Sequence, residues 1–362
     1  MPSADVVVIG AGLAGLSTGI ALAEAGASVF VAAKGMAATH WAHGALDVAA
    51  PPRAESARQG LRWLAAEGAH PYRIVAEDLE RGLADLRRWL EAGGLPYVGG
   101  LDDRFAMMPT PIGSLRPVSI VPGGQAAVLD PWRPDEGLLL VGIQRYRDAW
   151  AGYAARNLRA AAWQPGPARV AAIEVQLPPL DQLQNLTSLD LARFFDDPAW
   201  RDRALGLIRR ALPRDGTWRI GMPAVMGLAA HAEVMRDAER VLGSPVFEVP
   251  GPPPSVPGLR LFEVLRRRLL DAGARLQIGF PVVSSERDGS RIAAIHTEGA
   301  SRTLRLAADR FVLASGGIAG GGLRGEPDGR LVDTVFGFEL PGPSRDGWFH
   351  DDAALAGHPI QA

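Results

Sequence analysis

Residues 5 to 34 decide how this chain folds, and they read Asp-Val-Val-Val-Ile-Gly-Ala-Gly-Leu-Ala-Gly-Leu-Ser-Thr-Gly-Ile-Ala-Leu-Ala-Glu-Ala-Gly-Ala-Ser-Val-Phe-Val-Ala-Ala-Lys. The run Val6 to Ile9 is apolar and β-branched, which is typical of a buried parallel strand. Residues 13 to 25 have a helical composition, Gly26 ends that helix, and residues 28 to 33 form a second apolar run. This order predicts a strand–turn–helix–strand unit with a Rossmann-like topology.

The turn between the first strand and the helix carries Gly10, Gly12 and Gly15 at G-x-G-x-x-G spacing. In such a unit the first glycine permits the tight turn, the second lets the backbone approach a pyrophosphate, and the third allows the helix to pack closely on the strand. The helix N-terminus then faces the phosphates with free N–H groups. We therefore expect a dinucleotide or flavin site, with a purely structural βαβ unit as the alternative. The predicted cofactor-binding residues of this turn are Gly10, Ala11, Gly12, Leu13, Ala14 and Gly15.

The end of the second strand departs from the usual dinucleotide pattern. An Asp or Glu that binds the ribose hydroxyls is expected there, but this chain has Lys34-Gly35, and Lys34 is its only lysine. A cation suits a phosphate better than a ribose, which weakens an NAD interpretation. We predict that Lys34 and Gly35 meet the ribose or phosphate end of the cofactor; a solvated cation at the strand end is the alternative.

Composition excludes several classes of site. The chain has 362 residues, a formal net charge of −2 and no cysteine. The length allows more than one domain, and the charge gives no reason to expect nucleic acid. Without cysteine, any iron–sulfur centre of the pathway must lie on another polypeptide. Residues 6 to 23 are uncharged but contain glycines at fixed spacing, so we expect neither a leader nor a membrane span. The prediction is a cytoplasmic protein that reaches a membrane only through a partner.

A loop of small residues follows the second strand, over residues 35 to 47. In a flavoprotein such a loop passes beside the isoalloxazine ring. His40 is predicted to donate a hydrogen bond there or even to attach the flavin covalently; an ordinary loop histidine is the alternative. His40 and His43 are three residues apart with no third ligand nearby, so no metal site is predicted. The predicted cofactor contacts of this loop are Thr39, His40, Gly44, Ala45 and Leu46.

Proline-rich segments at 51–52 and 251–258 divide the chain into a discontinuous flavin-binding domain, 1–51 with 251–362, and an inserted cap domain for substrate or partner, 52–250. The insertion alternates strands and helices, which predicts an α/β fold. Its expected helices are 59–67, 74–92, 147–161, 190–212 and 224–242, and its expected strands are 137–144, 170–177 and 218–223. Residues 97 to 125 are expected to be irregular. There Arg116 either binds an anionic substrate or is structural.

The C-terminal part returns to the first sheet. After a helix at 259–272, residues 275–280, 282–287 and 291–297 predict a small antiparallel meander. A buried strand from Arg310 then ends in a glycine-rich segment, which in flavoproteins with two dinucleotide folds runs past the cofactor phosphates; a glycine-rich turn is the alternative. The predicted contacts are Ala314, Ser315, Gly316 and Gly317. Weak catalytic candidates, as an anion clamp and a general acid–base, are Arg345 and His350, besides His40 and Arg116.

Motifs along nearly the whole chain resemble one family, the B subunit of anaerobic glycerol-3-phosphate dehydrogenase, within the succinate dehydrogenase and fumarate reductase flavoprotein group. The first and last motifs are generic to flavoproteins, and the middle ones are more specific. They are Val8 to Leu16, Thr39-His40, Gly44 to Asp47, Ala69 to Tyr72, Thr110 to Arg116, Leu191 to Phe194, Met222 to Ala224, Gly227-Leu228, Pro253 to Ser255, Gly258 to Arg260 and Val312 to Gly316.

The resemblance implies oxidation of glycerol 3-phosphate to dihydroxyacetone phosphate by a flavoprotein subunit. Electrons would pass to a quinone through a complex with a catalytic A subunit, together with an iron–sulfur, membrane-binding C subunit. The resemblance implies FMN, whereas the glycine fingerprint indicates FAD. Alternatives are a non-catalytic subunit that relays electrons, and a fumarate-reductase-like enzyme for another small acid. The family usually closes over the flavin with a C-terminal glycine-rich strand and helix, and because Ile360-Gln-Ala362 follows without one, we expect a truncated chain with an incomplete site.

Overall fold

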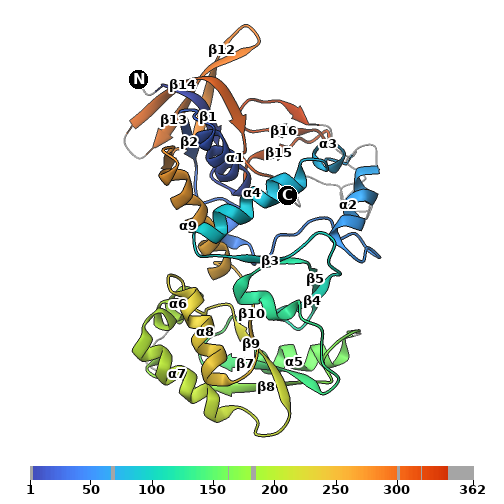
Figure 1. Ribbon diagram of the computed structural model, residues 1–362. Coiled ribbons are helices and arrows are strands. Elements are labelled where there is room, and N and C mark those ends of the chain that lie inside the picture. The colour runs from blue at the N-terminus through green and yellow to red at the C-terminus, as the bar shows by residue number, and fades with distance from the viewer. Residues whose placement is uncertain are drawn as a thin grey trace. The chain divides into compact units, whose positions relative to one another are not determined.

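The computed structural model describes residues 3–66, 70–161, 163–180, 185–299, 302–318 and 320–340. It divides into two compact units (Figure 1). The first, here the nucleotide-fold unit, comprises Met1–Thr39, Leu64–Trp89 and Phe262–Ala362, and the second, the middle unit, comprises His40–Trp63 and Leu90–Leu261. These divisions differ from the predicted 51/52 and 250/251, mainly because residues 64–89 join the first unit. As functional domains, the predicted segments stay a prediction.

The described strands of the nucleotide-fold unit form one main sheet with the order β11-β2-β1-β14-β13-β12. Its parallel part consists of β11 (Arg275–Ile278), β2 (Val29–Ala33), β1 (Ser3–Ile9) and β14 (Arg302–Leu313). Its antiparallel part adds β13 (Arg291–Gly299) and β12 (Val282–Asp288) to the edge of β14. The predicted βαβ unit therefore occupies the centre of this sheet, and the Rossmann-like fold class is confirmed.

The predicted meander was wrong in one strand. Residues 275–280 do not pair with 282–287; β11 lies at the opposite edge, parallel to β2. The reason is that β11 follows a helix, and a helical crossover brings a strand back in parallel. The meander is instead β12-β13-β14, whose last strand is long enough to continue into the parallel part beside β1.

Helices α1 (Leu13–Glu24) and α9 (Val256–Asp271, in this unit from Phe262 on) lie close together in the nucleotide-fold unit. A Cβ added to Gly19 of α1 would lie 2.8 Å from Leu269 of α9 and 3.2 Å from Val31 of the sheet. Gly19 thus permits the close approach of the helix to both neighbours. Glu24, the last residue of α1, binds Arg88 and Trp89 of α4 (Leu79–Ala92) and Arg268 of α9.

Smaller elements complete the nucleotide-fold unit or lie where the chain passes from one unit to the other. A short antiparallel sheet consists of β15 (Leu323–Gly325), β16 (Leu331–Asp333) and β17 (Glu339–Leu340). The remaining short helices are η1 (Ala38–Trp41), α2 (Ala57–Ala66) and α3 (Tyr72–Val75). The apolar core between the sheet and its neighbours contains Val7, Ile9, Phe30, Ala32, Ile295 and Leu306.

The middle unit is built on a parallel sheet whose described strands have the order β10-β9-β7-β8. These are β7 (Glu136–Ile143), β8 (Arg169–Val175), β9 (Thr217–Pro223) and β10 (Val246–Val249). The helices are α5 (Ala151–Ala160), α6 (Ser188–Asp196), α7 (Pro198–Ala211) and α8 (His231–Leu242). The predicted alternation of strands and helices in this region is confirmed, and β10 is a strand that the sequence pattern missed.

Four of the predicted helices have different bounds. The expected helix 74–92 is divided into α3 and α4, and the expected helix 147–161 begins only at Ala151 of α5. The expected helix 190–212 is two helices, α6 and α7, because Asp197 ends one and caps the next: its carboxylate accepts from the amides of Ala199 and Trp200. The expected helix 224–242 begins only at His231. Residues 224 to 230 are not helical, because the amides of Leu228 to Ala230 all donate to the Asp196 carboxylate.

Residues 97 to 125, expected to be irregular, contain short strands instead. β3 (Tyr97–Gly99) pairs with β6 (Ile120–Pro122), and β4 (Ala106–Pro109) pairs with β5 (Leu115–Val118). The 3₁₀ helix η2 (Gly123–Val128) follows. The prediction failed because each strand is only three or four residues long and contains or adjoins proline, which hides the alternating pattern of a strand.

Candidate cofactor site

The glycine turn after β1 is packed too tightly for side chains at two of its positions. Gly10 has φ +115°, and a Cβ there would lie 2.1 Å from the carbonyl oxygen of Ala314 at the end of β14. A Cβ on Gly15 would lie 2.0 Å from the carbonyl oxygen of Gly10. Because Gly10 has no Cβ, β1 and β14 can end side by side. Because Gly15 has none, α1 can begin directly against the turn.

Gly12 has a different environment, with room in front of its backbone. A Cβ there would meet only Ala37 at 3.3 Å and the Thr39 hydroxyl at 3.9 Å. Gly12 is the N-cap of α1 but has no side chain to cap it, and the hydroxyl of Thr39 accepts from the Leu13 amide over 3.1 Å instead. The first turn of α1 carries no acidic residue. Its next amides, of Ala14 and Gly15, have no partner within the helix, and its dipole favours an anion.

The carboxyl ends of β2 and β14 supply the neighbouring segments. Lys34 follows β2 and is exposed, with its Nζ 3.9 Å from the point where a Cβ on Gly321 would lie. Gly316 and Gly321 have φ of +81° and +76°, so the segment after β14 turns where other residues would be strained. Thr334 fixes this segment, because its hydroxyl donates to the Gly321 carbonyl over 2.8 Å.

The nucleotide-fold unit therefore brings together a large share of the predicted cofactor-binding residues at the carboxyl ends of parallel strands, where ligands bind in sheets of this kind. They are Gly10, Ala11, Gly12, Leu13, Ala14, Gly15, Lys34, Gly35, Thr39, Ala314, Ser315, Gly316 and Gly317. The space in front of Gly12 and the uncapped amides of Ala14 and Gly15 are here called the glycine cradle. This cradle, together with the adjacent cation Lys34, fits a pyrophosphate. The site thus fits the pyrophosphate of a dinucleotide cofactor on its own geometry.

The other predicted contacts, His40, Gly44, Ala45 and Leu46, belong to the middle unit. Gly44 has φ +97°, and its carbonyl accepts from the hydroxyl of buried Tyr97 over 2.6 Å. Burial raises the pKa of Tyr97, so this hydroxyl stays protonated and remains a donor. The ring atom Nδ1 of His40 is buried, and no described residue is its hydrogen-bond partner. Such an atom is available to a ligand.

Arg116 is engaged within the protein. Its guanidinium binds the carboxylate of Asp47, which also lies 3.0 Å from Nε2 of His43. His43 accepts from the Ala45 amide through Nδ1, which assigns the proton to Nε2 and makes it the donor to Asp47. This geometry favours the structural alternative for Arg116. Arg345 and His350 lie outside the described residues, and those residues contain no group of three or more potential metal ligands.

Sequence reasoning missed a buried charged network in the middle unit. Arg260 binds Glu248 through both terminal nitrogens, at 2.7 and 2.9 Å, and donates to the Gly227 carbonyl over 2.7 Å. Burial raises the pKa of Glu248, but the charge of Arg260 outweighs this effect and the net shift is downward. Burial lowers the pKa of the adjacent His231 and favours its neutral form. The only signal for this network was Arg260 in the Gly258-Leu-Arg motif.

Comparisons with known proteins identify the chain's family. The family described as "FAD binding domain" matches residues 5–361. A protein of Halobacterium salinarum, named as the probable B subunit of anaerobic glycerol-3-phosphate dehydrogenase, is 31% identical over 96% of this chain and 82% of its own length. The chain belongs to this B-subunit family. A Pectobacterium carotovorum member, named as the B subunit of the same dehydrogenase, is 33% identical over 96% of this chain and 83% of its own length.

Membership of the B-subunit family confirms the resemblance and the flavin-dependent oxidoreductase class. The match to the FAD-binding family supports FAD and gives no support to FMN. Among solved structures, the 3-ketosteroid Δ1-dehydrogenase of Sterolibacterium denitrificans is similar, with a TM-score of 0.39 and 17% identity; this chain spans 48% of its length. None of the helices in the described part of the chain has the length and apolar character needed to cross a bilayer.

Proposed function

We propose that this protein binds FAD through its nucleotide-fold unit and oxidises glycerol 3-phosphate to dihydroxyacetone phosphate. It would do so in a complex with a catalytic A subunit, together with an iron–sulfur C subunit that passes electrons to a quinone and holds the complex at the inner membrane. The names of the B-subunit relatives support glycerol 3-phosphate as the substrate and partner subunits in general, and the roles of those subunits follow from the family resemblance. The assignment of FAD to this site rests on the open backbone at Gly12 beside the uncapped amides of α1.

Each segment around the cradle has a separate part in holding FAD. The amides of Ala14 and Gly15 would donate to the pyrophosphate, and Gly12 would let the phosphate oxygens approach the backbone. Lys34 would bind the phosphate or the ribose from the end of β2. The prediction that His40 of the middle unit meets the flavin is supported by its buried Nδ1, which has no partner among the described residues. When bound, FAD supplies the acceptance of two electrons, and the protein supplies position and charge.

The cofactor proposal is tested by adding one methyl group at two glycines. In Gly12→Ala the new Cβ lies 3.3 Å from the Ala37 methyl, a tight contact that a shift of a few tenths of an ångström relieves, so we expect the fold to survive, but the methyl stands where a phosphate must approach. In Gly82→Ala of α4 no atom lies within 4 Å of the new Cβ. We expect the Gly12 variant to purify with at most about a tenth of the flavin of the Gly82 control. Visible absorption and mass spectrometry of the released cofactor measure flavin content and separate FAD from FMN. Equal flavin in both variants would refute the cradle.

The substrate and complex proposals need a separate experiment. Turnover with glycerol 3-phosphate and an artificial electron acceptor is compared with turnover of succinate and of a 2-hydroxy acid, both for the isolated chain and for the complex of the three subunits. Selective oxidation of glycerol 3-phosphate by the complex supports the proposal. The engagement of Arg116 by Asp47 favours the relay alternative: in that case the isolated chain is inactive, and removing the flavin from this chain lowers electron transfer to quinone but not substrate oxidation by the catalytic partner.

A further inference from the structure

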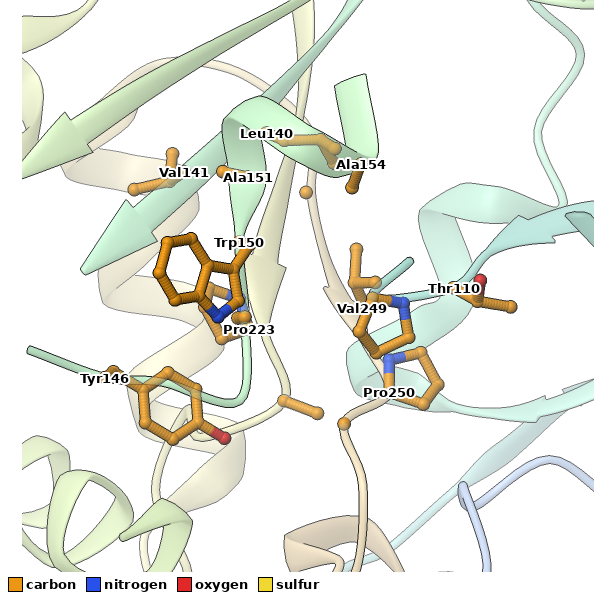
Figure 2. A pocket seen from close by; sticks show the side chains of 15 residues that line it. Thr110, Leu140, Val141, Tyr146, Trp150, Ala151, Ala154, Pro223, Val249 and Pro250 are labelled. Atoms are coloured by element: carbon orange, nitrogen blue, oxygen red, sulfur yellow. The ribbon is translucent and has the colours of Figure 1, made fainter. Parts of the chain in front are cut away.

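The middle unit has a pocket at the carboxyl ends of its parallel strands, separate from the glycine cradle (Figure 2). Its free space is about 380 Å³, including the open mouth. The ends of β7, β9 and β10 form one side, and the start of α5 with the loop before it forms the other. Residues that shape it include Leu140, Tyr146, Trp150, Pro223, Val249 and Pro250.

The topology of the sheet explains why a pocket lies here. After β7 the chain continues through α5 to β8 at one edge of the sheet. After β9 it continues through α8 to β10 at the opposite edge. The connections after the neighbouring strands β7 and β9 therefore diverge. In open parallel sheets the crevice at such a point is where ligands bind.

The walls of the pocket are mainly apolar. Leu140 and Val249 come from strands, Pro223 ends β9 and Pro250 follows β10. Trp150 stands at the mouth with 65% of its surface exposed. The indole N–H of Trp150 donates to the carbonyl of Arg147 over 2.6 Å, so it is not available to a ligand. Such walls suit the faces of a flat ring.

One polar group faces the open space of the pocket. Tyr146 is 5% exposed as a residue, and its hydroxyl is not among the buried unpartnered atoms and forms no hydrogen bond within the described part of the chain, so the oxygen is reached by solvent through the pocket. Figure 2 shows this hydroxyl directed towards the interior, on the side opposite Pro250. A tyrosine hydroxyl with no partner in the protein can donate its proton to an occupant of the pocket in place of water.

Two carboxylates close to the pocket disfavour an anionic ligand. The amide of Gly152, in the first turn of α5, donates to the carboxylate of Glu174, which already uses the positive end of this helix. Asp148, two residues from Tyr146, adds a second negative charge close to the hydroxyl. A ligand with its own negative charge would be repelled by both carboxylates.

We propose that this pocket binds a small, uncharged ring compound with a carbonyl oxygen that accepts a hydrogen bond from the Tyr146 hydroxyl. The ring lies on the apolar walls between Trp150 and Pro250. This site does not depend on the proposed glycerol-3-phosphate activity, because all of its residues lie within the middle unit and none of them belongs to the cradle.

The test compares three probes that differ in one property each, with the full-length, flavin-loaded protein. Acetophenone has the ring and the carbonyl, ethylbenzene lacks the acceptor, and benzoate carries a negative charge. Titrations followed by saturation-transfer NMR are expected to show acetophenone binding at least about fivefold more tightly than ethylbenzene, as one hydrogen bond provides. Benzoate is expected to bind more weakly than acetophenone. Equal binding of acetophenone and ethylbenzene, tighter binding of benzoate, or no saturable binding at all would overturn the proposal.

A pair of tyrosine variants links the binding to one hydroxyl. Tyr146→Phe should abolish the preference for acetophenone and leave ethylbenzene unaffected, whereas Tyr153→Phe, at a 48% exposed residue that does not line the pocket, should change neither. Without ligand, Tyr146→Phe should keep or raise the melting temperature, because its hydroxyl has no internal partner. A preference that survives in Tyr146→Phe, or a lowered melting temperature, would show that the hydroxyl serves the fold and not a ligand.

Discussion

The hydroxyl oxygen of Thr39 lies 3.1 Å from the backbone nitrogen of Leu13 and accepts the first N–H of α1. Thr39 is in the η1 turn, 26 residues further along the chain. A side-chain cap at the N-terminus of a helix normally comes from the preceding residue, which here is Gly12. The chain thus caps α1 from a distant segment, and the N-cap position keeps a glycine whose backbone is open to a phosphate.

This arrangement predicts that Thr39→Val destabilises the protein although the side chain keeps its shape. Valine fills the same volume but leaves the partly buried Leu13 amide without an acceptor, so we expect a loss of about 1 kcal/mol in the free energy of unfolding. Thr39→Ser retains the hydroxyl and should lose less. Denaturant unfolding of the flavin-free forms measures both; a serine variant as unstable as the valine variant would show that the methyl group, not the hydrogen bond, matters.

The parts of the fold that the sequence predicted are those encoded by neighbouring residues. The strand–turn–helix–strand unit of residues 5 to 34 and the alternation of the middle region both follow from local patterns of apolar residues. The parallel pairing of β1 with β14 was expected because a strand that ends in Ser315-Gly316-Gly317 accompanies a glycine turn in flavoproteins.

The parts that the sequence did not predict depend on partners far apart in the chain. The start of α8 at His231 is set by Asp196, whose carboxylate accepts from amides 32 to 34 residues later. Glu248 is buried because Arg260 neutralises it, and a pattern of apolar residues gives no indication of a buried charge. The edge position of β11 likewise follows from its crossover helix and not from its own sequence.

Lys34 is expected to strengthen FAD binding by its charge. Lys34→Met should weaken FAD binding about three- to tenfold, and the difference from the wild type should shrink as ionic strength rises, because salt screens an exposed cation. Lys34→Arg keeps the charge and should bind nearly as the wild type. Flavin fluorescence titration of the flavin-free protein at two salt concentrations provides the affinities.

Because Lys34 is the only lysine, labelling gives an independent measurement. Acetylation of its amine should be slower in the FAD-loaded protein than in the flavin-free protein, as followed by mass spectrometry of the peptide containing it. Equal acetylation rates, together with salt-independent affinity of the methionine variant, would mean that Lys34 is only a solvated cation at the end of β2.

Glu24 is expected to stabilise the nucleotide-fold unit in a pH-dependent way. Its hydrogen bonds with Arg88, together with those from Arg268 and Trp89, lower its pKa from 4.5 to about 2 despite the opposing effect of burial. A lowered pKa in the folded state contributes stability that is fully present above the unfolded pKa and is lost as pH falls from about 4.5 to about 2. Glu24→Gln should therefore cost about 1–2 kcal/mol at pH 7 and progressively less below pH 4.5.

Urea unfolding of the Glu24→Gln variant from pH 7 down to the acid limit of the folded state measures this dependence. Glu77→Gln, at an exposed glutamate of the same unit, is the matched control and should be close to the wild type throughout. A penalty for Glu24→Gln that stays constant over the acid range would show that packing of the side chain, not its charge, is responsible.

The buried pair of Glu248 and Arg260 is expected to be a sensitive position of the middle unit. Glu248→Gln keeps an acceptor for the Met226 amide, which donates to Glu248 over 2.9 Å, but leaves the Arg260 guanidinium buried without a counter-charge. Breaking a buried ion pair in this way costs about 3–5 kcal/mol. Arg260→Met should cost a similar amount, because it leaves the fully buried carboxylate of Glu248 unpaired.

When both replacements are combined, no buried charge of this pair remains, so the double variant should be more stable than the sum of the single losses predicts, by about 1–3 kcal/mol. Denaturant unfolding of the wild type, the two single variants and the double variant measures the interaction energy of the pair. Strictly additive losses would mean that the two side chains contribute through packing alone.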